Sequence, residues 1–423
     1  MTMATGSPAG LLGLFPPGSR VGADGELVVG GCRLADLAAR WGTPLYVVDE
    51  AAVRARVRRF RRALDAAWPN SRMVFASKAF PSTAMYRLMA GEGIGVDVAG
   101  PGELAMALAG GVDPARIVLH GNAKTRAELQ LALGAGVGLI VIDSTDDIDR
   151  LDGLVSSEQA VLLRVQPGVR PDTYDAVATG QAGSKFGLPL PAARKAIGRL
   201  RGGKLRLDGL HLHIGSQILS AEPYTRAVQA VAGLGEFPIY NLGGGLGVRY
   251  TYADRPPSPE EWVGALAAAA RRWLPAGAQL IIEPGRSLVA PFGVTVYRVV
   301  SVKDGDPPFV AVDGGMADNM EVALYGQRFE ATVTSRVGGG SLAELVGRHC
   351  ESGDRLVSGV PLRDPRPGDL VAMPVTGAYC FTMANNYNGA LRPPVLFVRD
   401  GQPREVVRRE TLADLMSRDL PPA

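Results

Sequence analysis

The feature that most constrains the fold is an alternation of short, apolar, strand-like segments with helical segments, repeated eight times between residues 73 and 282. Segments with helical periodicity lie between the strand-like ones, for example Ser82–Met89, Glu103–Leu108, Arg126–Leu133 and Pro259–Leu274. Eight such repeats predict a parallel (β/α)8 barrel, in which chemistry collects at the carboxyl ends of the strands. The strand-like segments are Met73–Ala76, Gly95–Val98, Ile117–Leu119, Leu139–Ile142, Val161–Val165, Leu207–Leu212, Ile239–Leu242 and Leu280–Ile282.

The pattern changes after about residue 290. Gly293–Lys303, Phe329–Arg336 and Pro394–Val398 alternate β-branched and polar residues between Gly and Pro turns, which is typical of strands. We therefore expect an α/β protein with a TIM-type barrel at residues 45–290. A mostly β domain follows at residues 291–423, and the N-terminal segment 1–44 is expected to join it.

Composition excludes several classes of protein. The 423 residues are 46% hydrophobic and carry a formal net charge of only +3, so a large core is expected and a nucleic-acid partner is not. The N-terminus lacks a cationic leader, and no segment approaches about 18 consecutive apolar residues, so we expect neither secretion nor a membrane span. Three cysteines, Cys32, Cys350 and Cys380, are too few for a disulfide framework and fit the reducing cytoplasm.

Polar or ionisable side chains follow the strand-like segments and would converge at one mouth of a barrel. Lys78 ends the segment Val74–Lys78, which places its amine beside apolar walls. There desolvation lowers the lysine pKa and favours imine formation with an aldehyde such as pyridoxal phosphate, although a single strand-end lysine is more often a surface charge. The residues at strand ends are Lys78, Asp97, His120, Asp143, Arg164, His213, Gly243, Gly244, Gly245 and Glu283.

Two further motifs suit a phosphorylated, nitrogen-containing ring. Gly243-Gly-Gly-Leu-Gly247 leaves backbone N–H groups free to hold a phosphate, with Ser216 as a second donor, although a tight turn is the simpler interpretation of a glycine triplet. Glu283-Pro-Gly-Arg286 pairs a carboxylate, which can keep a pyridine nitrogen protonated, with a guanidinium for a phosphate or substrate carboxylate. The alternative is a simple ion pair between Glu283 and Arg286.

His211 and His213 alternate on one strand and raise the question of a metal site. With His120 and His349 the only other histidines, no His/Cys cluster completes such a site, and no metal is expected. An imidazole stacked on a flat cofactor ring explains one of the pair better, and the other is interpreted as a core histidine.

Cys350 lies in the polar stretch His349-Cys-Glu-Ser-Gly-Asp354. A single cysteine is usually a small core residue. Here the flanking Glu351 and Asp354 favour a site, since buried acids need a reason, and a thiol can donate a proton or act as a nucleophile.

Seven motifs, taken in order, resemble those of diaminopimelate decarboxylases. The resemblance runs from about Leu34 to Leu415, nearly the whole chain, and extends to the wider group of alanine-racemase-fold decarboxylases that use pyridoxal phosphate. It implies α-decarboxylation of an amino-acid substrate. The motifs are Phe75-Ala-Ser-Lys78-Ala-Phe, His211-Leu-His-Ile-Gly-Ser-Gln217, Asn241-Leu-Gly-Gly-Gly-Leu-Gly247, Glu283-Pro-Gly-Arg286, Asp313-Gly-Gly-Met316, Cys350-Glu-Ser-Gly-Asp354 and Gly377-Ala-Tyr379.

The resemblance also implies a role for each residue. Lys78 binds the cofactor covalently, His213 stacks on its ring and Glu283 holds the pyridine nitrogen. Cys350 and Glu351 reach into the barrel of a second subunit, which makes the enzyme an obligate homodimer, and Cys350 returns a proton after CO2 departs. The phosphate is held by Ser216, the backbone of Gly243, Gly244 and Gly245, Arg286 and Tyr379, and the substrate by Arg286, Glu321, Tyr325, Glu351 and Tyr379.

One departure from the family pattern bears on the substrate. Glu321 stands where diaminopimelate decarboxylases carry an arginine that grips the far carboxylate of the substrate. Two unit charges about 4 Å apart interact by about 4 kcal/mol at an effective dielectric constant of about 20. With glutamate in place of arginine, this interaction with the far carboxylate of the substrate changes from attraction to repulsion. We hypothesise a substrate whose far end is cationic or neutral, such as a basic amino acid, an amide or an aminoacyl group on a carrier protein, in a specialised biosynthetic pathway. The alternative is meso-diaminopimelate decarboxylase forming L-lysine, with Arg286 alone binding the far carboxylate and Glu321 pointing to solvent.

Two other functions on the same barrel are less favoured. Related racemases place an arginine at the pyridine nitrogen and use a tyrosine as second base, whereas Glu283 and Cys350 match the decarboxylases. A catalytically idle protein that only binds the cofactor is disfavoured because Lys78, Glu283 and Cys350 all persist and the chain exceeds a single barrel.

Overall fold

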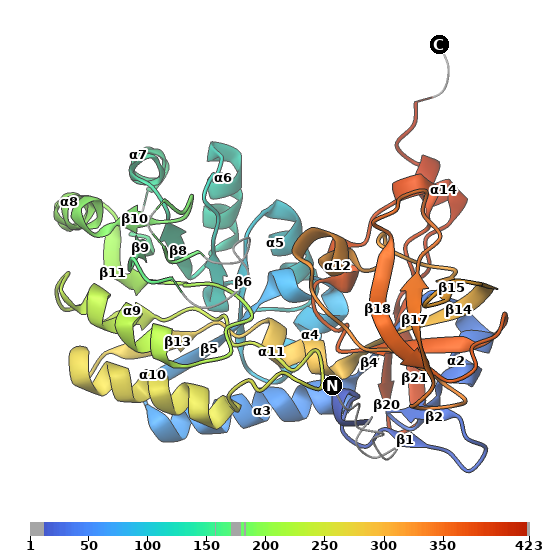
Figure 1. Cartoon of the computed structure of the whole chain (residues 1–423). Helices are drawn as coiled ribbons and strands as arrows, with labels where there is room; N and C mark the ends of the chain where they lie inside the picture. Colours follow the sequence, from blue (N-terminus) through green and yellow to red (C-terminus); the bar gives the residue numbers. More distant parts are fainter. Residues whose placement is uncertain (1–11, 157, 171–178, 182, 421–423) are drawn as a thin grey trace. The chain divides into compact units, whose positions relative to one another are not determined.

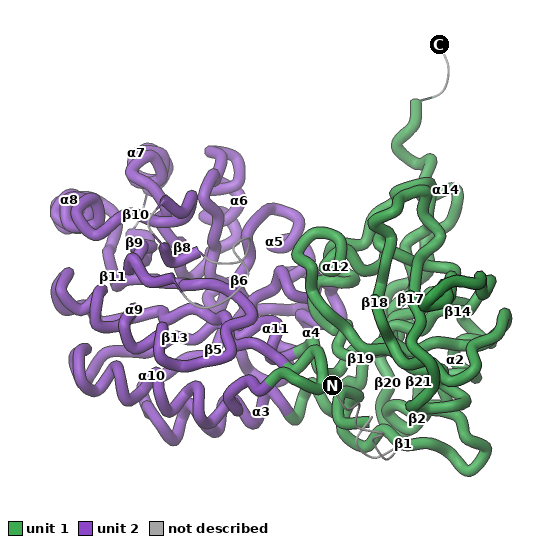
Figure 2. The backbone as a smooth tube through the Cα atoms, viewed as in Figure 1, with its two compact units in different colours: residues 1–55, 249–254, 289–423 green, residues 56–248, 255–288 purple. Residues whose placement is uncertain are grey.

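The computed structural model describes residues 12–156, 158–170, 179–181 and 183–420 (Figure 1). The chain divides into two compact units (Figure 2). Unit 1 comprises Met1–Ala55, Arg249–Asp254 and Val289–Ala423, and unit 2 comprises Arg56–Val248 and Arg255–Leu288.

Unit 2 is a closed barrel of parallel strands. Each strand pairs in parallel with its neighbours, and the ring closes where β13 pairs with β5. The predicted (β/α)8 barrel is therefore confirmed, with eight barrel strands among the described residues. In ring order they are β5 (Ser71–Ala76), β6 (Gly95–Val98), β7 (Ile117–Leu119), β8 (Leu139–Ile142), β9 (Ala160–Gln166), β11 (Arg206–His211), β12 (Ile239–Asn241) and β13 (Gln279–Ile282).

The barrel strands are short apolar runs because both of their faces are buried. Val74, Val141, Leu162 and Ile281 belong to one buried core cluster, and the helices surround the strands in Figure 1. A short strand, β10 (Leu188–Pro189), adds to the edge of β9. The helices are α3 (Glu50–Ala67), α4 (Thr83–Gly91), α5 (Pro101–Ala109), α6 (Arg126–Ala135), α7 (Thr145–Asp152), α8 (Leu190–Arg201), α9 (Glu222–Ala232), α10 (Pro259–Trp273) and the short α11 (Arg286–Val289).

Unit 1 is mostly β, as predicted. Its larger sheet has the order β18-β17-β15-β14-β4-β20-β21, with β19 pairing with β14 and β16, and a small antiparallel sheet has the order β1-β2-β3. The predicted strand at Phe329–Arg336 is reduced to the two residues of β16. Phe329 lies outside it and packs its ring edge-on against Tyr250, with centroids 5.0 Å apart. The strands are β1 (Arg20–Val21), β2 (Leu27–Val29), β3 (Cys32–Arg33), β4 (Leu45–Asp49), β14 (Gly293–Lys303), β15 (Phe309–Val312), β16 (Thr332–Val333), β17 (Ser341–Val346), β18 (Arg355–Leu362), β19 (Leu370–Pro374), β20 (Val395–Arg399) and β21 (Gln402–Val407).

Four helices accompany these sheets among the described residues: α2 (Leu34–Trp41), α12 (Met320–Tyr325), α13 (Cys380–Met383) and α14 (Leu412–Met416). The core of the unit is apolar. Leu45 and Val47 of β4 and Val294 of β14 are fully buried in one cluster with Leu396 of β20. β4 pairs antiparallel with β14 and parallel with β20. A strand from the N-terminal part of the chain therefore lies in the same sheet as strands from the C-terminal part.

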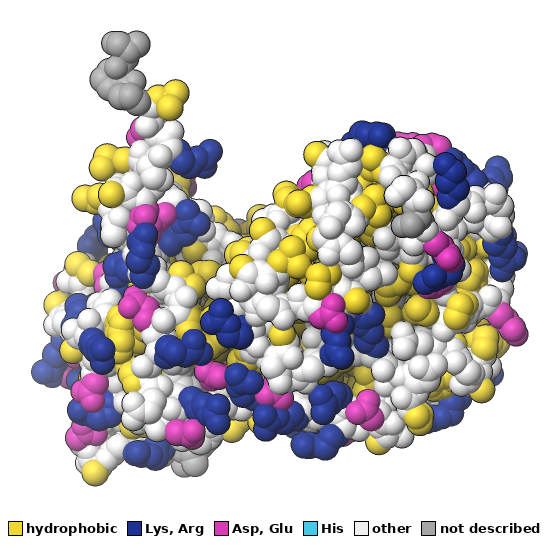
Figure 3. All heavy atoms as spheres, turned by 180° about the vertical axis from the view of Figure 1, so that it is seen from behind, with side chains coloured by type: hydrophobic (Ala, Val, Ile, Leu, Met, Phe, Trp, Pro, Cys, Tyr) yellow, Lys and Arg dark blue, Asp and Glu magenta, His cyan; other side chains and the backbone are white. Residues whose placement is uncertain are grey.

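The surface carries charges of both signs. On the face shown in Figure 3, acidic and basic side chains are spread among one another. Arg59 and Glu260, for example, form an exposed pair at 2.7 Å, a type of contact that stabilises a protein by about 0.2–1 kcal/mol. Within the described ranges, no helix is long and apolar enough to cross a bilayer.

Asp318 supplies a pH-dependent element of stability in unit 1. Its carboxyl group is buried and accepts a hydrogen bond from the Gly315 amide at 2.9 Å. Burial raises the pKa of Asp318 to about 7, with the nearby Asp313 and Asp354 acting in the same direction. The folded protein therefore holds this proton at pH values where the unfolded chain releases it.

We expect unit 1 to lose stability as the pH rises. The contribution of a group with a raised pKa is complete below its unfolded value of 3.8 and is lost as the pH rises through about 7. Between pH 5 and pH 8 this costs about 2–3 kcal/mol. Asp318→Asn, which keeps an acceptor for the Gly315 amide, should lose less stability over that range in urea titrations, and Asp304→Asn, at an exposed site, should behave as wild type. Equal pH dependence in all three proteins contradicts the assignment.

Candidate active site

The carboxyl ends of the barrel strands surround a cavity of about 260 Å³. Most of the polar strand-end residues that were predicted to converge line this cavity. Asp143 lies outside the lining and instead accepts the Gly187 amide at 3.0 Å and faces Arg164 at 3.6 Å. The cavity is lined by Ala76, Lys78, Asp97, Ala99, His120, Gly121, Asn122, Arg164, Phe186, His211, His213 and Glu283.

Lys78 lies in a 3-10 turn, Ser77–Ala79, directly after β5. Its side chain is exposed to the cavity. The cavity wall combines apolar residues such as Ala76 and Phe186 with polar side chains from the ends of the neighbouring strands. Asp97 accepts the Ser77 amide at 2.9 Å and thereby fixes the turn that carries the lysine.

Glu283 lies just beyond β13 and is almost fully buried. Its Oε1 is 2.8 Å from His120 Nε2 and 2.6 Å from Asn241 Nδ2, and its Oε2 is 3.1 Å from His211 Nε2. His211, interpreted from the sequence as a possible core histidine, is thus a hydrogen-bond donor to this carboxylate. The side chains of His120, His211 and Asn241 together fix the position of both carboxylate oxygens.

The local electrostatics keep Glu283 charged and His211 neutral. Burial disfavours the carboxylate, but the adjacent His120 and His211 and their hydrogen bonds hold the pKa of Glu283 well below its usual value. Burial lowers the pKa of His211 to about 4, against the opposing pull of Glu283. Burial, followed by repulsion from Glu283, raises the pKa of Asp97 to about 7. The cavity therefore presents a charged carboxylate next to the neutral imidazole of His211 at neutral pH.

The same three side chains also meet a geometric criterion for metal ligands. One atom each from His120, His211 and Glu283 lies within 4.8 Å of the others. The sequence argument against a metal considered only histidines and cysteines, and it missed this combination. In the structure, each imidazole Nε2 donates to the carboxylate, which accounts for the arrangement by hydrogen bonding.

His213 lies two residues beyond the end of β11 and lines the cavity. Its Nδ1 accepts a hydrogen bond from the Gly244 amide at 3.2 Å, so the ring proton lies on Nε2 and the ring plane is held. Burial, followed by the positive charge of Lys78, lowers the pKa of His213 well below its usual value. The ring is thus neutral and can stack on a flat ligand.

The glycine run is required by close backbone packing. A Cβ on Gly244 would lie 2.0 Å from the Glu283 carbonyl oxygen, and one on Gly245, at φ +105°, would lie 2.3 Å from that of Gly215. The amides of Gly243 and Gly244 donate to Asn241 and His213. The prediction that both amides are free for a phosphate is therefore wrong. Among the described residues, the Gly245 amide has no such acceptor.

Arg286 and Ser216 lie together, as predicted. Arg286 begins α11 and is buried, and its Nε donates to Ser216 Oγ at 3.3 Å. A guanidinium and a hydroxyl at this spacing form an anion-binding pair. The simpler interpretation of the motif was an ion pair between Glu283 and Arg286. In the structure, the partners of Glu283 are instead His120, His211 and Asn241.

Comparison with known proteins assigns the family. Residues 50–290 match the model of the pyridoxal-dependent decarboxylases, pyridoxal binding domain. The chain is 47% identical to diaminopimelate decarboxylase of Actinosynnema pretiosum subsp. auranticum, over 98% of this chain and 97% of that protein. The chain belongs to the diaminopimelate decarboxylase family. The Bacillus subtilis member is 41% identical over 95% of this chain and 97% of its own length.

The crystal structures of other family members agree with this assignment. Diaminopimelate decarboxylase from M. jannaschii, in complex with L-lysine, superposes with a TM-score of 0.89 at 29% identity, over 96% of this chain and 98% of that one. The Helicobacter pylori enzyme gives a TM-score of 0.86 at 27% identity, over 91% and 98%. The predicted family, fold class and enzyme class are confirmed: the chain is a pyridoxal-dependent amino-acid decarboxylase.

Five of the residues that the family resemblance implicates lie in unit 1, and three of them are Tyr379, Cys350 and Glu351. Tyr379 is half-buried and adopts φ +62°, a left-handed conformation that is rare for a bulky side chain and costs about 1–3 kcal/mol. Cys350 is exposed, and its amide donates to Asn388 Oδ1 at 3.0 Å. Glu351 is also exposed and accepts a hydrogen bond from the Tyr387 hydroxyl at 2.7 Å.

The two acids that flank Cys350 differ in burial. The expectation that both are buried at a site is wrong for Glu351. Asp354 is buried for a structural reason, because it accepts the amides of Met316 at 2.6 Å and His349 at 2.7 Å. Exposure of Cys350 and Glu351 in the single chain leaves both available to a neighbouring molecule.

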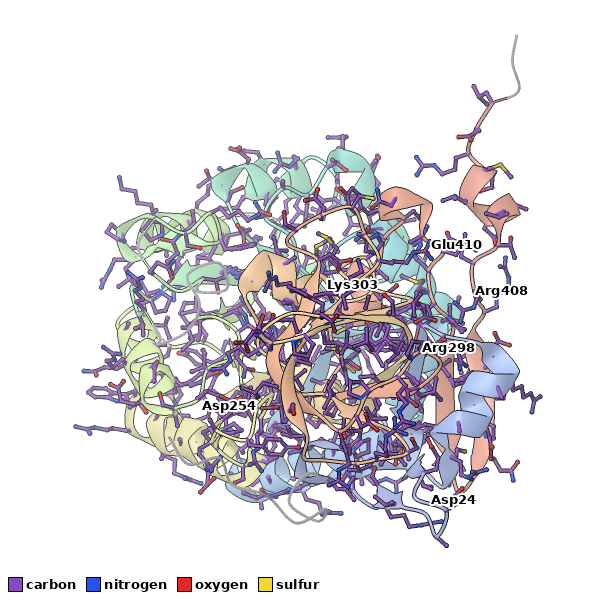
Figure 4. The ribbon with its side chains drawn as sticks, turned by 45° about the vertical axis from the view of Figure 1, so that its right-hand side comes forward. Asp24, Asp254, Arg298, Lys303, Arg408 and Glu410 are labelled. Atoms are coloured by element: carbon purple, nitrogen blue, oxygen red, sulfur yellow. The ribbon has the colours of Figure 1, made fainter. Side chains whose placement is uncertain are left out.

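Glu321 of α12, the residue that departs from the family pattern, is 1% exposed. Its Oε2 accepts a hydrogen bond from the Tyr250 hydroxyl at 3.2 Å. Asp254, labelled in Figure 4, holds the amides of Tyr250 at 3.0 Å and Thr251 at 2.7 Å. The interpretation that Glu321 points to solvent is therefore wrong. Tyr325, at the end of the same helix, is half-buried.

Proposed function

We propose that the barrel cavity binds pyridoxal phosphate, with Lys78 as the covalent attachment point and Glu283 at the ring nitrogen. The observation that carries this proposal is the environment of Glu283. A buried carboxylate is kept charged and fixed by His120, His211 and Asn241, in the wall of the cavity that also holds Lys78. A fixed negative charge of this kind stabilises a protonated pyridine nitrogen.

The remaining polar groups fit the rest of the cofactor. Ser216 and Arg286 supply an anion-binding pair for the phosphate, and the Gly245 amide supplies a backbone donor beside them. His213, neutral and held by the Gly244 amide, offers a flat ring face. Tyr379 is assigned to the phosphate by family resemblance alone.

The chemistry divides between cofactor and protein. Pyridoxal phosphate, when bound, supplies an electron sink for the negative charge left on the substrate α-carbon when CO2 departs. Glu283 keeps a proton on the ring nitrogen, because its own pKa is held low and its oxygens are fixed. Lys78 holds the cofactor between turnovers. We assign to Cys350 the return of a proton to the α-carbon.

A homodimer follows from the role given to Cys350. Its thiol and the Glu351 carboxylate are exposed on unit 1 of the single chain, and the family resemblance directs them to the cavity of a second copy. We therefore infer that each active site takes residues from two chains.

For the substrate, we propose an amino acid whose far end is cationic or neutral. Glu321 supports this because its buried carboxyl group is held by the Tyr250 hydroxyl, and Asp254 in turn holds the Tyr250 amide. A negative charge at this position attracts an ammonium or amide group and repels a carboxylate. Decarboxylation of meso-diaminopimelate to L-lysine remains the second candidate, favoured by 37–47% identity to enzymes of that name over nearly their whole length.

A substrate panel distinguishes the two candidates. We expect the holoenzyme to release CO2 faster from basic amino acids or amides than from meso-diaminopimelate. Glu321→Arg should raise kcat/KM for meso-diaminopimelate by at least about 10-fold, since repulsion becomes attraction.

Glu321→Gln, which removes the charge at nearly constant volume, should give a smaller gain, and its unfolding temperature reports whether the fold survives. Efficient turnover of meso-diaminopimelate by the wild type, with no gain in either variant, contradicts the substrate proposal. It leaves the cofactor proposal intact.

A further inference from the structure

A second cavity, of about 370 Å³, lies at the opposite end of the barrel. It is bordered by the amino ends of three strands: Ser71 begins β5, Gly95 begins β6 and Gln279 begins β13. The catalytic cavity, by contrast, lies at the carboxyl ends. The volume falls within the range of about 300–1,000 Å³ that is typical of small-molecule sites.

The walls of this cavity are basic. Among the described residues that line it, the charged ones are Arg61, Arg72, Arg116 and Asp65, which gives a net charge of +2. Arg61 and Arg116 are held at the rim, because each donates one N–H to a backbone carbonyl, of Glu92 at 2.8 Å and of Gly93 at 2.9 Å. A guanidinium carries five N–H donors, so each of these side chains retains further donors after this contact.

Two adjacent residues of the lining, Ser71 and Arg72, each carry a buried polar atom. Arg72 Nη2 and Ser71 Oγ are both inaccessible to solvent, and neither has a hydrogen-bond partner among the described residues. Buried donors of this kind are rare in folded proteins, and each calls for an explanation such as a bound water or ion. Burial, followed by repulsion from Arg116, lowers the pKa of Arg72, and attraction to Asp113 and Glu283 acts against this shift. A bound anion would add a further attraction for the Arg72 guanidinium.

We propose that this cavity binds a phosphate group, either as inorganic phosphate or as part of a small phosphate monoester. A phosphate carries a charge of about −1.5 to −2 at neutral pH and three or more acceptor oxygens, which matches a net +2 wall with guanidinium and hydroxyl donors. The site is separate from the phosphate-binding pair of Ser216 and Arg286, and the inference does not rest on the proposed function.

Isothermal titration of the holoenzyme tests the site. Inorganic phosphate and glycerol 3-phosphate are titrated separately at constant ionic strength, with chloride as the background anion. We expect saturable phosphate binding that weakens by about 10-fold or more in Arg72→Gln and in Arg116→Gln, as loss of a charged hydrogen-bonding group predicts. Binding of glycerol 3-phosphate as well identifies a monoester site, and binding of phosphate alone identifies a site for the free ion.

Two control variants make the result decisive. Arg62→Gln removes an exposed arginine that neighbours Arg61 on α3 but does not line the cavity, and it should bind as wild type. Ser216→Ala should also leave this binding unchanged, because it alters only the catalytic cavity. Arg116 is exposed, so its variant remains informative if Arg72→Gln does not fold. The absence of saturable phosphate binding, or equal affinity in wild type, Arg72→Gln and Arg116→Gln, overturns the proposal.

Discussion

Lys78→Ala is expected to lower kcat/KM for CO2 release by a factor on the order of 10⁴ or more, because the variant loses the amine to which we assign the covalent attachment of the cofactor. The visible absorbance of the purified protein should disappear or shift to that of free cofactor. Lys78 is exposed in the cavity, so its removal creates no apolar void and the fold should persist. Steady-state CO2 release and the absorption spectrum measure both effects.

Lys195→Ala is the matched control, since Lys195 is exposed on α8 outside the cavity. It should retain wild-type rate and spectrum. Substantial activity in Lys78→Ala, with the cofactor still attached through a covalent bond, would transfer the attachment role to another lysine.

Glu283→Gln should lower kcat by about 10²–10³-fold, the usual effect of removing one preorganised electrostatic group from an active site. The substitution is nearly isosteric, so Asn241 and at least one histidine can keep a hydrogen bond to the new amide oxygen. We therefore expect the cofactor to remain bound through Lys78 and the phosphate contacts. The absorbance maximum should move, because the charge at the ring nitrogen is gone.

Glu260→Gln, an exposed site on α10 that pairs with Arg59, should change neither kcat nor spectrum. If Glu283→Gln has wild-type kcat and an unaltered spectrum, Glu283 does not act on the cofactor. If Glu283→Gln instead fails to bind the cofactor at all, the carboxylate contributes to binding more than to turnover. The pH dependence of the absorbance separates these outcomes, because only a charged partner at the ring nitrogen keeps the spectrum constant over the neutral range.

The barrel was predictable because its strands are buried on both faces and therefore appear as short, mostly apolar runs. The shared location of Lys78, His213 and Glu283 in one cavity could be predicted because each follows such a run, and the carboxyl ends of all strands meet at one mouth. In unit 1 the strand at Phe329–Arg336 was overpredicted, since an alternating pattern also arises when single side chains such as Phe329 turn inward from a loop.

The support around Glu283 could not be predicted from local patterns. His120 lies 163 residues away in sequence and Asn241 lies 42 residues away, and only closure of the ring brings them to one carboxylate. The same applies to Glu321, whose partner Tyr250 is 71 residues distant. The motif Asn241-Leu-Gly243 carried one usable signal, because an asparagine at a strand end, like a histidine, has few reasons to be buried unless it is hydrogen-bonded.

Reduction of the holoenzyme with borohydride, followed by proteolysis and mass spectrometry, asks where the cofactor is attached. If Lys78 and Glu283 hold the same ring from opposite sides, the pyridoxyl mass will be found on the peptide that contains Lys78. A label on one of the other five lysines of the chain, or no label on a protein that is active and coloured, would contradict this assignment of the active site.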